Sequence, residues 1–176
     1  MSEGQYFKLS AEGRAIIPLF VKPRSGTTLV KIFFKLDTGA DITTIGRHSL
    51  FGDLDYNEDL IQKDRLERKK FPLSRAGRKS EPANCLIMPM LHFAGKDFTS
   101  WPLHVGRTKE DDFPNLLGLD ILTHFNFTFN YDKGHVFIKP AQSPSILLPK
   151  IIAEEPELII THPEIRNQQV FDVRSE

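Results

Sequence analysis

The chain of 176 residues has a single cysteine and no excess of either charge. One cysteine, Cys85, excludes a framework of internal disulfides. The 23 Lys and Arg residues balance the 23 Asp and Glu residues, so we expect no basic surface for nucleic acid and no basic anchor for a membrane. The longest apolar runs are only a few residues, far below the roughly 20 that span a bilayer. The sequence therefore predicts neither nucleic acid nor a membrane as a partner.

The ends of the chain carry different signals from its centre. Residues 1–5 have neither a basic start nor an apolar segment, so we expect no signal peptide. Together with the single cysteine, this predicts a cytoplasmic protein. Prolines punctuate residues 140–176, which predicts an extension that docks on the body or on a partner, or is partly disordered. We therefore expect one domain over residues 1–139, followed by this extension.

Alternating apolar and polar residues predict a chain built mainly of strands. In residues 28–36, Val30, Ile32 and Phe34 share one face, while Lys31 and Lys35 lie on the other. Similar patterns predict strands over 5–9, 15–21, 28–36, 85–93, 98–105, 125–131 and 135–139. Residues 46–54 indicate a surface turn with a short helix, and the heavily charged residues 55–70 indicate a solvated helical or loop insertion. The expected fold class is all-β.

The most informative stretch is Asp37-Thr38-Gly39-Ala40, where an apolar strand ends in an acidic turn. A strand that runs into such a turn holds a carboxylate at a fixed point. Gly39 lets the backbone approach whatever lies over that carboxylate, and Thr38 offers a short hydroxyl that can bond neighbouring backbone. Apolar and β-branched residues resume after Asp41.

A second informative segment, Leu116-Leu117-Gly118, precedes an expected short helix. The two segments together resemble the signature of the retropepsin-like aspartic proteases, over roughly residues 14–139. In that family the apolar-apolar-Gly segment passes beside the active-site loop. The resemblance implies a small, closed, barrel-like fold with one short helix, assembled as a two-fold homodimer. Leu119 stands where retroviral members often have an Arg that pairs with the acid after the Ala, which here is Asp41.

The resemblance also implies roles for individual residues. Asp37 is the expected catalytic acid, and Thr38-Gly39-Ala40 is its supporting loop. Substrate contacts are expected from Gly39, from Asp41 and from a flap hairpin with Ala76-Gly77-Arg78 at its tip. This segment has a single glycine and a basic tip, and a plain surface loop is the alternative interpretation.

One Asp-Thr-Gly sequence supplies one carboxylate, whereas this chemistry needs two that share a proton. No second Asp-Thr-Gly or Asp-Ser-Gly occurs in the chain, and the nearest match, Asp132-Lys133-Gly134, reads as a hairpin turn. A two-fold homodimer supplies the missing acid as Asp37 of the second chain. We therefore expect an aspartic endopeptidase that cuts extended polypeptides as a homodimer, without a metal or another cofactor.

Other functions are weighed against this one. A protein of the same fold could dimerise and bind extended peptides without cutting them. A metal-dependent hydrolase could use the six histidines, with His92 and His104 facing each other across a hairpin, although no two have His-Glu-x-x-His spacing. Cys85 could act as a nucleophile, but its apolar neighbours favour an inert thiol.

Overall fold

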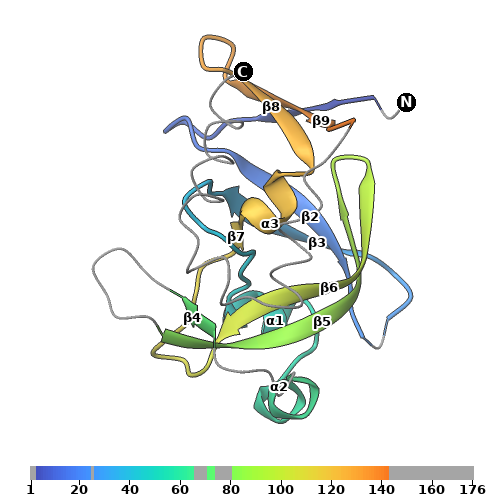
Figure 1. Ribbon diagram of the computed structural model, residues 1–176, viewed down its shortest axis with the longest axis vertical. Coiled ribbons are helices and arrows are strands. Elements are labelled where there is room, and N and C mark those ends of the chain that lie inside the picture. The colour runs from blue at the N-terminus through green and yellow to red at the C-terminus, as the bar shows by residue number, and fades with distance from the viewer. Residues whose placement is uncertain (1–2, 25, 66–70, 74–80, 143–176) are drawn as a thin grey trace.

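The computed structural model describes residues 3–24, 26–65, 71–73 and 81–142, and strands form most of its regular structure (Figure 1). Its strands are β1 (Gln5–Lys8), β2 (Ile16–Lys22), β3 (Val30–Leu36), β4 (Phe71–Leu73), β5 (Glu81–Phe93), β6 (Lys96–Gly106), β7 (Leu116–Leu117), β8 (Phe125–Asn130) and β9 (His135–Pro140). Its helices are α1 (Arg47–Gly52), α2 (Glu58–Asp64) and α3 (Leu119–Leu122). The prediction of a mainly β protein is confirmed. The extension expected from residue 140 lies outside the described residues beyond 142.

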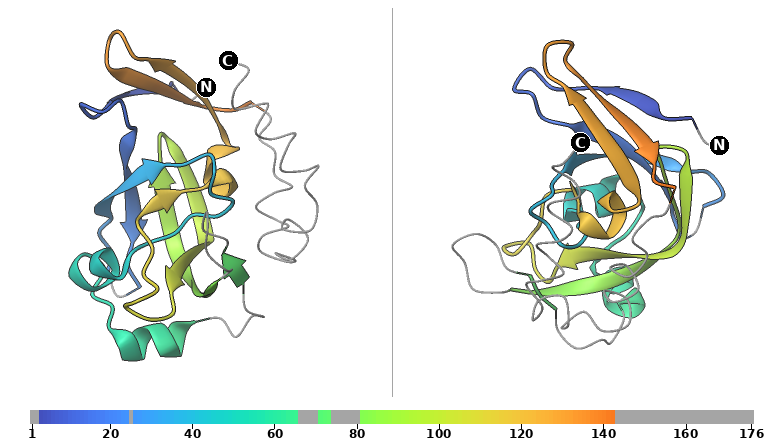
Figure 2. Two further views of the ribbon diagram at one scale, coloured as in Figure 1. Left: turned by 90° about the vertical axis from the view of Figure 1, so that its left-hand side faces the viewer. Right: turned by 45° about the horizontal axis from the view of Figure 1, so that its top comes forward.

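The smaller sheet has the strand order β1-β9-β8 and is antiparallel throughout. It lies across one end of the molecule, above the larger sheet in Figure 2. Val136 and Ile138 of β9 are buried on its inner face, whereas Tyr6 of β1 is exposed. This alternation follows from the period of two in the sequence, because successive side chains of a strand point to opposite faces.

The larger sheet has the order β4-β5-β2-β3-β7, and β6 also pairs with β5, outside this order. A long antiparallel hairpin joins β5 to β6 through Ala94 and Gly95, which both have positive φ. Two such residues form the tight turn that matches the twist of a hairpin. The short β7 is parallel to β3 and pairs with its last two residues, Lys35 and Leu36. This pairing therefore places β7 beside the end of β3.

The expected closed barrel is wrong for the part of the chain that the structure describes. The larger sheet ends at β7 on one side and at β6 on the other, and Thr44 lies between these strands. Its backbone forms isolated bridges to His104 of β6 and to Leu116 of β7. Because Gly46 is already the N-cap of α1, the segment around Thr44 is too short to form a strand that would close the sheet.

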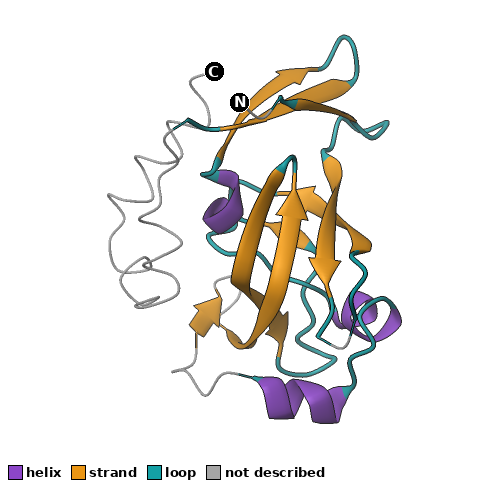
Figure 3. Cartoon of the chain, turned by 90° about the vertical axis from the view of Figure 1, so that its right-hand side faces the viewer, coloured by secondary structure: helices purple, strands orange, loops and turns teal. Residues whose placement is uncertain are grey.

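The resemblance implied one short helix, but the described residues contain three. The segment expected to hold a short helix forms α1, and the charged segment after it forms α2. The start of α2 is well capped, because Asn57 Oδ1 accepts a hydrogen bond from Leu60 N at 2.8 Å. In Figure 3, α3 lies at the junction of the two sheets, while α1 and α2 lie toward the opposite end. None of the helices in the described ranges is long and apolar enough to cross a membrane.

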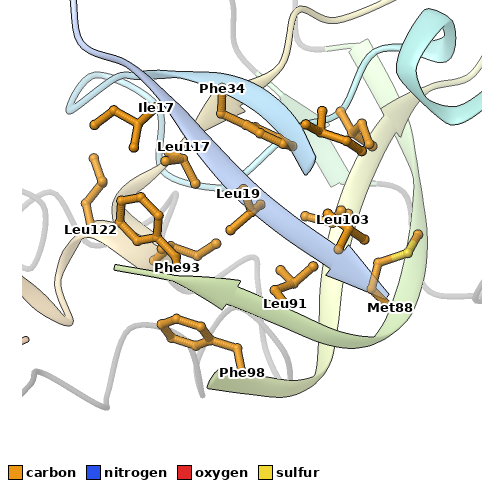
Figure 4. Close-up of a cluster of buried hydrophobic side chains, with 14 of the residues drawn as sticks. Ile17, Leu19, Phe34, Met88, Leu91, Phe93, Phe98, Leu103, Leu117 and Leu122 are labelled. Atoms are coloured by element: carbon orange, nitrogen blue, oxygen red, sulfur yellow. The ribbon is translucent and has the colours of Figure 1, made fainter. Parts of the chain in front are cut away.

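The hydrophobic core joins the two sheets and α3. Ile17 and Leu19 of β2, Phe34 of β3 and Leu117 of β7 are fully buried and lie close together in Figure 4. Phe93 at the end of β5 packs edge to face against Phe125 of β8, with ring centroids 4.9 Å apart. Each fully buried side chain of this size stabilises the fold by roughly 1.5–3 kcal/mol. The core therefore fixes β3 and β7, the two strands that lead to the acidic turn.

Candidate active site

Asp37 lies at the point where β3 ends, in a loop that we name the Asp37 loop (residues 37–43). Its backbone N–H donates to Leu117 O at 3.0 Å, and its carbonyl accepts from Ala40 N at 3.2 Å. The carboxylate is partly exposed, and Asp37 Oδ1 accepts from Gly39 N at 2.9 Å. A methyl group at Gly39 would lie only 3.2 Å from that oxygen. The turn thus holds the carboxylate in place, and Gly39 leaves space beside it.

The segment formed by β7 and α3 supports the Asp37 loop through backbone hydrogen bonds. Leu119 N donates to Ala40 O at 2.8 Å, and Asp120 N donates to Asp41 O at 3.2 Å. The expectation that Leu116-Leu117-Gly118 runs beside the acidic turn is therefore confirmed. A backbone held by several such bonds resists displacement, which is the requirement for a positioned catalytic group.

Gly118 allows the two segments to touch. A Cβ atom at this position would lie 2.4 Å from the carbonyl carbon, 2.5 Å from the oxygen and 2.8 Å from the nitrogen of Ile42. Any residue other than glycine would therefore collide with the backbone of the Asp37 loop. The φ of Gly118 is −94°, a value open to all residues, so the requirement for glycine is one of space and not of backbone conformation.

A buried side-chain network completes the support. Thr43 Oγ1 donates to Asp120 Oδ1 at 2.7 Å and accepts from Gly118 N at 3.1 Å. Asp120 is fully buried, and burial raises the pKa of its carboxyl group to about 6, against the lowering effect of the Thr43 hydrogen bond. The loop that carries Asp37 is thus tied to α3 by a side chain as well as by backbone.

The residues before β7 are held in place by Arg47, at the first position of α1. Its buried guanidinium donates to the carbonyls of Gly106, Arg107 and Thr108, at 2.9, 2.6 and 3.1 Å. It also forms an ion pair with Glu58 at the start of α2. Five donors in a planar fork suit this set of partners, which a lysine could not replace. Arg47 therefore joins both helices to the chain that leaves β6.

The structure brings together most of the residues singled out from the sequence. Asp37, Thr38-Gly39-Ala40 and Asp41 share one loop, and Leu116-Leu117-Gly118 lies against it. The three residues of the expected flap tip, Ala76-Gly77-Arg78, lie outside the described residues.

The alternative metal and thiol sites gain no support from the described residues. His92 and His104 do not face each other, because the β5–β6 register sets His92 opposite Asp97 and His104 opposite Cys85. Burial lowers the pKa of His104 to about 4, and Cys85 is buried. Among the described residues, no three His, Cys, Asp or Glu side chains are grouped as metal ligands.

Three supporting residues were missed from the sequence. Asp120 could have been found, since it is an acid between Leu119 and Ile121 in an apolar segment, where a charge needs a buried partner. Thr43 and Arg47 carry no such signal: Asp120, which accepts from Thr43, and the three carbonyls that accept from Arg47 are more than fifty residues away in the chain.

The arrangement can position one carboxylate at the surface of a rigid loop. Such a group can act as a general acid or base, or form half of a pair with an acid from another molecule. Comparisons of the chain with protein-family models, with curated proteins and with solved structures gave no match.

Proposed function

We propose that the chain is an aspartic endopeptidase that works as a two-fold homodimer, with Asp37 of each chain forming the catalytic pair. The observation that carries this proposal is the Asp37-Thr38-Gly39 turn at the end of β3, fixed against Leu117 by the Asp37 N–H. A retropepsin-like fold is part of the same proposal. It is supported by the position of β7 and α3 beside the loop.

The electrostatic setting of Asp37 is compatible with this role. Among the described residues, no Lys, Arg or His forms an ion pair with its carboxylate. Gly39 N is a neutral donor to Oδ1, so the carboxylate is oriented without being committed to a cation. A second carboxylate could then share a proton with it, because two like charges in contact cannot both stay ionised.

The proposed mechanism uses the two acids in opposite protonation states. The ionised Asp37 removes a proton from a water molecule, which attacks the carbonyl carbon of an extended peptide. The protonated Asp37 of the second chain donates its proton to the carbonyl oxygen as the tetrahedral intermediate forms. A proton then passes to the amide nitrogen, and the C–N bond breaks. The Asp37 loop contributes by holding each carboxylate at a fixed depth.

The first test compares Asp37→Asn with the unchanged protein on an unfolded polypeptide between about pH 4 and 7, the range in which one shared proton is retained. Cleavage should be lost, with far-UV circular dichroism and sedimentation unchanged. Asp53→Asn is a matched control, because Asp53 is exposed and lies outside the Asp37 loop. Retained cleavage by Asp37→Asn would overturn the proposal.

A second test mixes the two kinds of chain. If equal amounts of unchanged and Asp37→Asn subunits are unfolded and refolded together, only about a quarter of the dimers contain two acids. Activity should then fall to about a quarter of that of the same total amount of unchanged protein. A fall to only one half would mean that each chain works alone. Binding of a statine-type inhibitor without any cleavage would favour the peptide-binding protein instead.

A further inference from the structure

Asp120 has two carboxylate oxygens in very different surroundings. Oδ1 accepts two hydrogen bonds, from Thr43 Oγ1 at 2.7 Å and from Ile121 N at 3.0 Å. Oδ2 is completely buried and makes no hydrogen bond. Because Oδ1 is already engaged twice, a proton bound by this carboxyl group resides on Oδ2. The unused oxygen is therefore the place where the charge of Asp120 changes.

The indole of Trp101 is the neighbour that responds to this charge. Trp101 lies on β6, its Nε1 is also buried without a hydrogen bond, and its N–H lowers the pKa of Asp120. An indole N–H can only donate. It can satisfy an ionised Oδ2, but it opposes a protonated Oδ2, whose O–H is also a donor. Trp101 thus acts on this carboxyl group without a hydrogen bond to it, and the sign of that interaction depends on one proton.

The other end of the network is the Asp37 loop. Thr43 Oγ1 donates to Asp120 and accepts from Gly118 N, and the backbone of residues 119 and 120 holds Ala40 and Asp41. Hydrogen bonds to an ionised acceptor are roughly twice as strong as neutral ones. The hydrogen bond from Thr43 to Asp120 is therefore stronger when the carboxyl group is ionised.

The other titratable groups on the surrounding elements do not account for the shifted pKa of Asp120. The Asp37 loop carries Asp37 and Asp41, β6 carries Lys96 and His104, and His124 follows α3. None of these charges contributes to the shifted pKa of Asp120, which is due to burial. Burial lowers the pKa of His104 to about 4, and burial together with Lys96 lowers that of His124 to about 4. Neither histidine titrates where Asp120 does, close to pH 6.

We propose that Asp120 is a proton-sensitive positioning residue for the Asp37 loop. The ionised carboxylate holds Thr43 on one side and the Trp101 indole on the other, and protonation weakens both contacts. The coupling itself does not depend on the reaction. Its effect on catalysis rests on the proposed endopeptidase function.

The coupling can be measured without any activity, because Trp101 is the only tryptophan in the chain. In an Asp37→Asn background, which also prevents self-cleavage, the indole N–H resonance is followed by NMR from about pH 4.5 to 8, together with the Gly118 amide. Both signals should shift with one common midpoint near pH 6. Adding Asp120→Asn should abolish the common transition, since the amide does not titrate.

Two further variants keep the test decisive if Asp120→Asn does not fold. Thr43→Val removes a hydrogen bond that lowers the pKa of Asp120, so the midpoint should rise by about one pH unit or more. His124→Gln is the matched control and should leave the midpoint unchanged. The proposal is overturned if the indole does not titrate near pH 6, if the Gly118 amide fails to follow it, or if the Thr43→Val midpoint does not move.

The effect on catalysis is tested in protein that keeps Asp37. The pH profile of kcat should show an inflection with the same midpoint as the NMR transition, and Asp120→Asn should remove it while leaving KM nearly unchanged. An identical kcat profile in Asp120→Asn would refute the catalytic part. If the indole titrates but no variant cleaves peptide at any pH, the proposed endopeptidase function is wrong, while the coupling of Asp120 to the loop stands.

Discussion

Replacing Gly118 by alanine tests the contact on which the candidate site depends. The new Cβ would lie 2.4–2.8 Å from three backbone atoms of Ile42. Ordinary contacts of a Cβ begin near 3.4 Å, so the Asp37 loop or α3 must retreat by about 1 Å. Neither can yield by rotating a side chain, because the colliding atoms belong to the main chain.

The expected cost follows from that displacement. Overpacking of a filled site costs about 1–3 kcal/mol. A retreat of about 1 Å also stretches the hydrogen bonds that Gly118, Leu119 and Asp120 donate to the loop, each contributing about 1 kcal/mol. We therefore expect Gly118→Ala to lower the free energy of unfolding by about 3–5 kcal/mol. If the chain is a protease, misplacing Asp37 by this amount should reduce kcat by about 100-fold.

Urea unfolding at neutral pH, followed by far-UV circular dichroism and by the fluorescence of Trp101, measures this loss. Gly52→Ala is the matched control. Gly52 is the last residue of α1, and a Cβ there would meet nothing within 4 Å. Alanine is favoured over glycine in helices by about 0.8–1 kcal/mol, so this variant should be as stable as the unchanged protein or slightly more stable. The reasoning is refuted if Gly118→Ala unfolds at the unchanged urea concentration.

Three further predictions follow from other contacts. Asp120→Asn should change the pH dependence of stability. The raised pKa means that the folded chain holds a proton which the unfolded chain releases, so the unchanged protein loses about 2 kcal/mol relative to the variant as pH rises from about 4 to 7. A difference in urea stability between the two proteins that is the same at both pH values would contradict this. Arg47→Lys should lower the free energy of unfolding by about 3 kcal/mol in thermal or urea unfolding, since one ammonium cannot replace the guanidinium bonds to three carbonyls and Glu58. As a control, Arg24→Lys, at an exposed ion pair with Asp64, should lower it by less than about 1 kcal/mol. Equal losses in the two variants would refute the role of Arg47. The activity per chain should fall on dilution if Asp37 works as a pair, in step with dissociation measured by sedimentation, and a constant specific activity of the dissociated chain would exclude the pair.

Local patterns in the sequence were sufficient to predict most of the strands. The alternation of Val30, Ile32 and Phe34 with lysines placed β3 correctly, because one buried face imposes a period of two. The acidic turn at Asp37 and the segment at Leu117 were both recognised locally, and the structure brings them side by side.

The features that the sequence did not predict depend on contacts between distant segments. Thr43 and Asp120 are 77 residues apart, so neither residue alone indicates the buried hydrogen bond between them. The closed barrel is expected from the resemblance alone. The residues around Thr44 do not indicate that this segment forms isolated bridges in place of a strand. The β5–β6 register, which separates His92 from His104, is likewise fixed by the whole hairpin.

The pairing of β1 with β9 has a consequence for the order in which the protein can fold. Gln5 lies opposite Ile138, so β1 leaves the ribosome long before β9 and finds its neighbour only when nearly all of the described chain has been made. During synthesis, its backbone donors and acceptors stay open while the larger sheet assembles. A ribosome-stalled chain that stops before residue 135 should therefore protect the amides of β2 and β3 from exchange while leaving those of residues 5–8 unprotected.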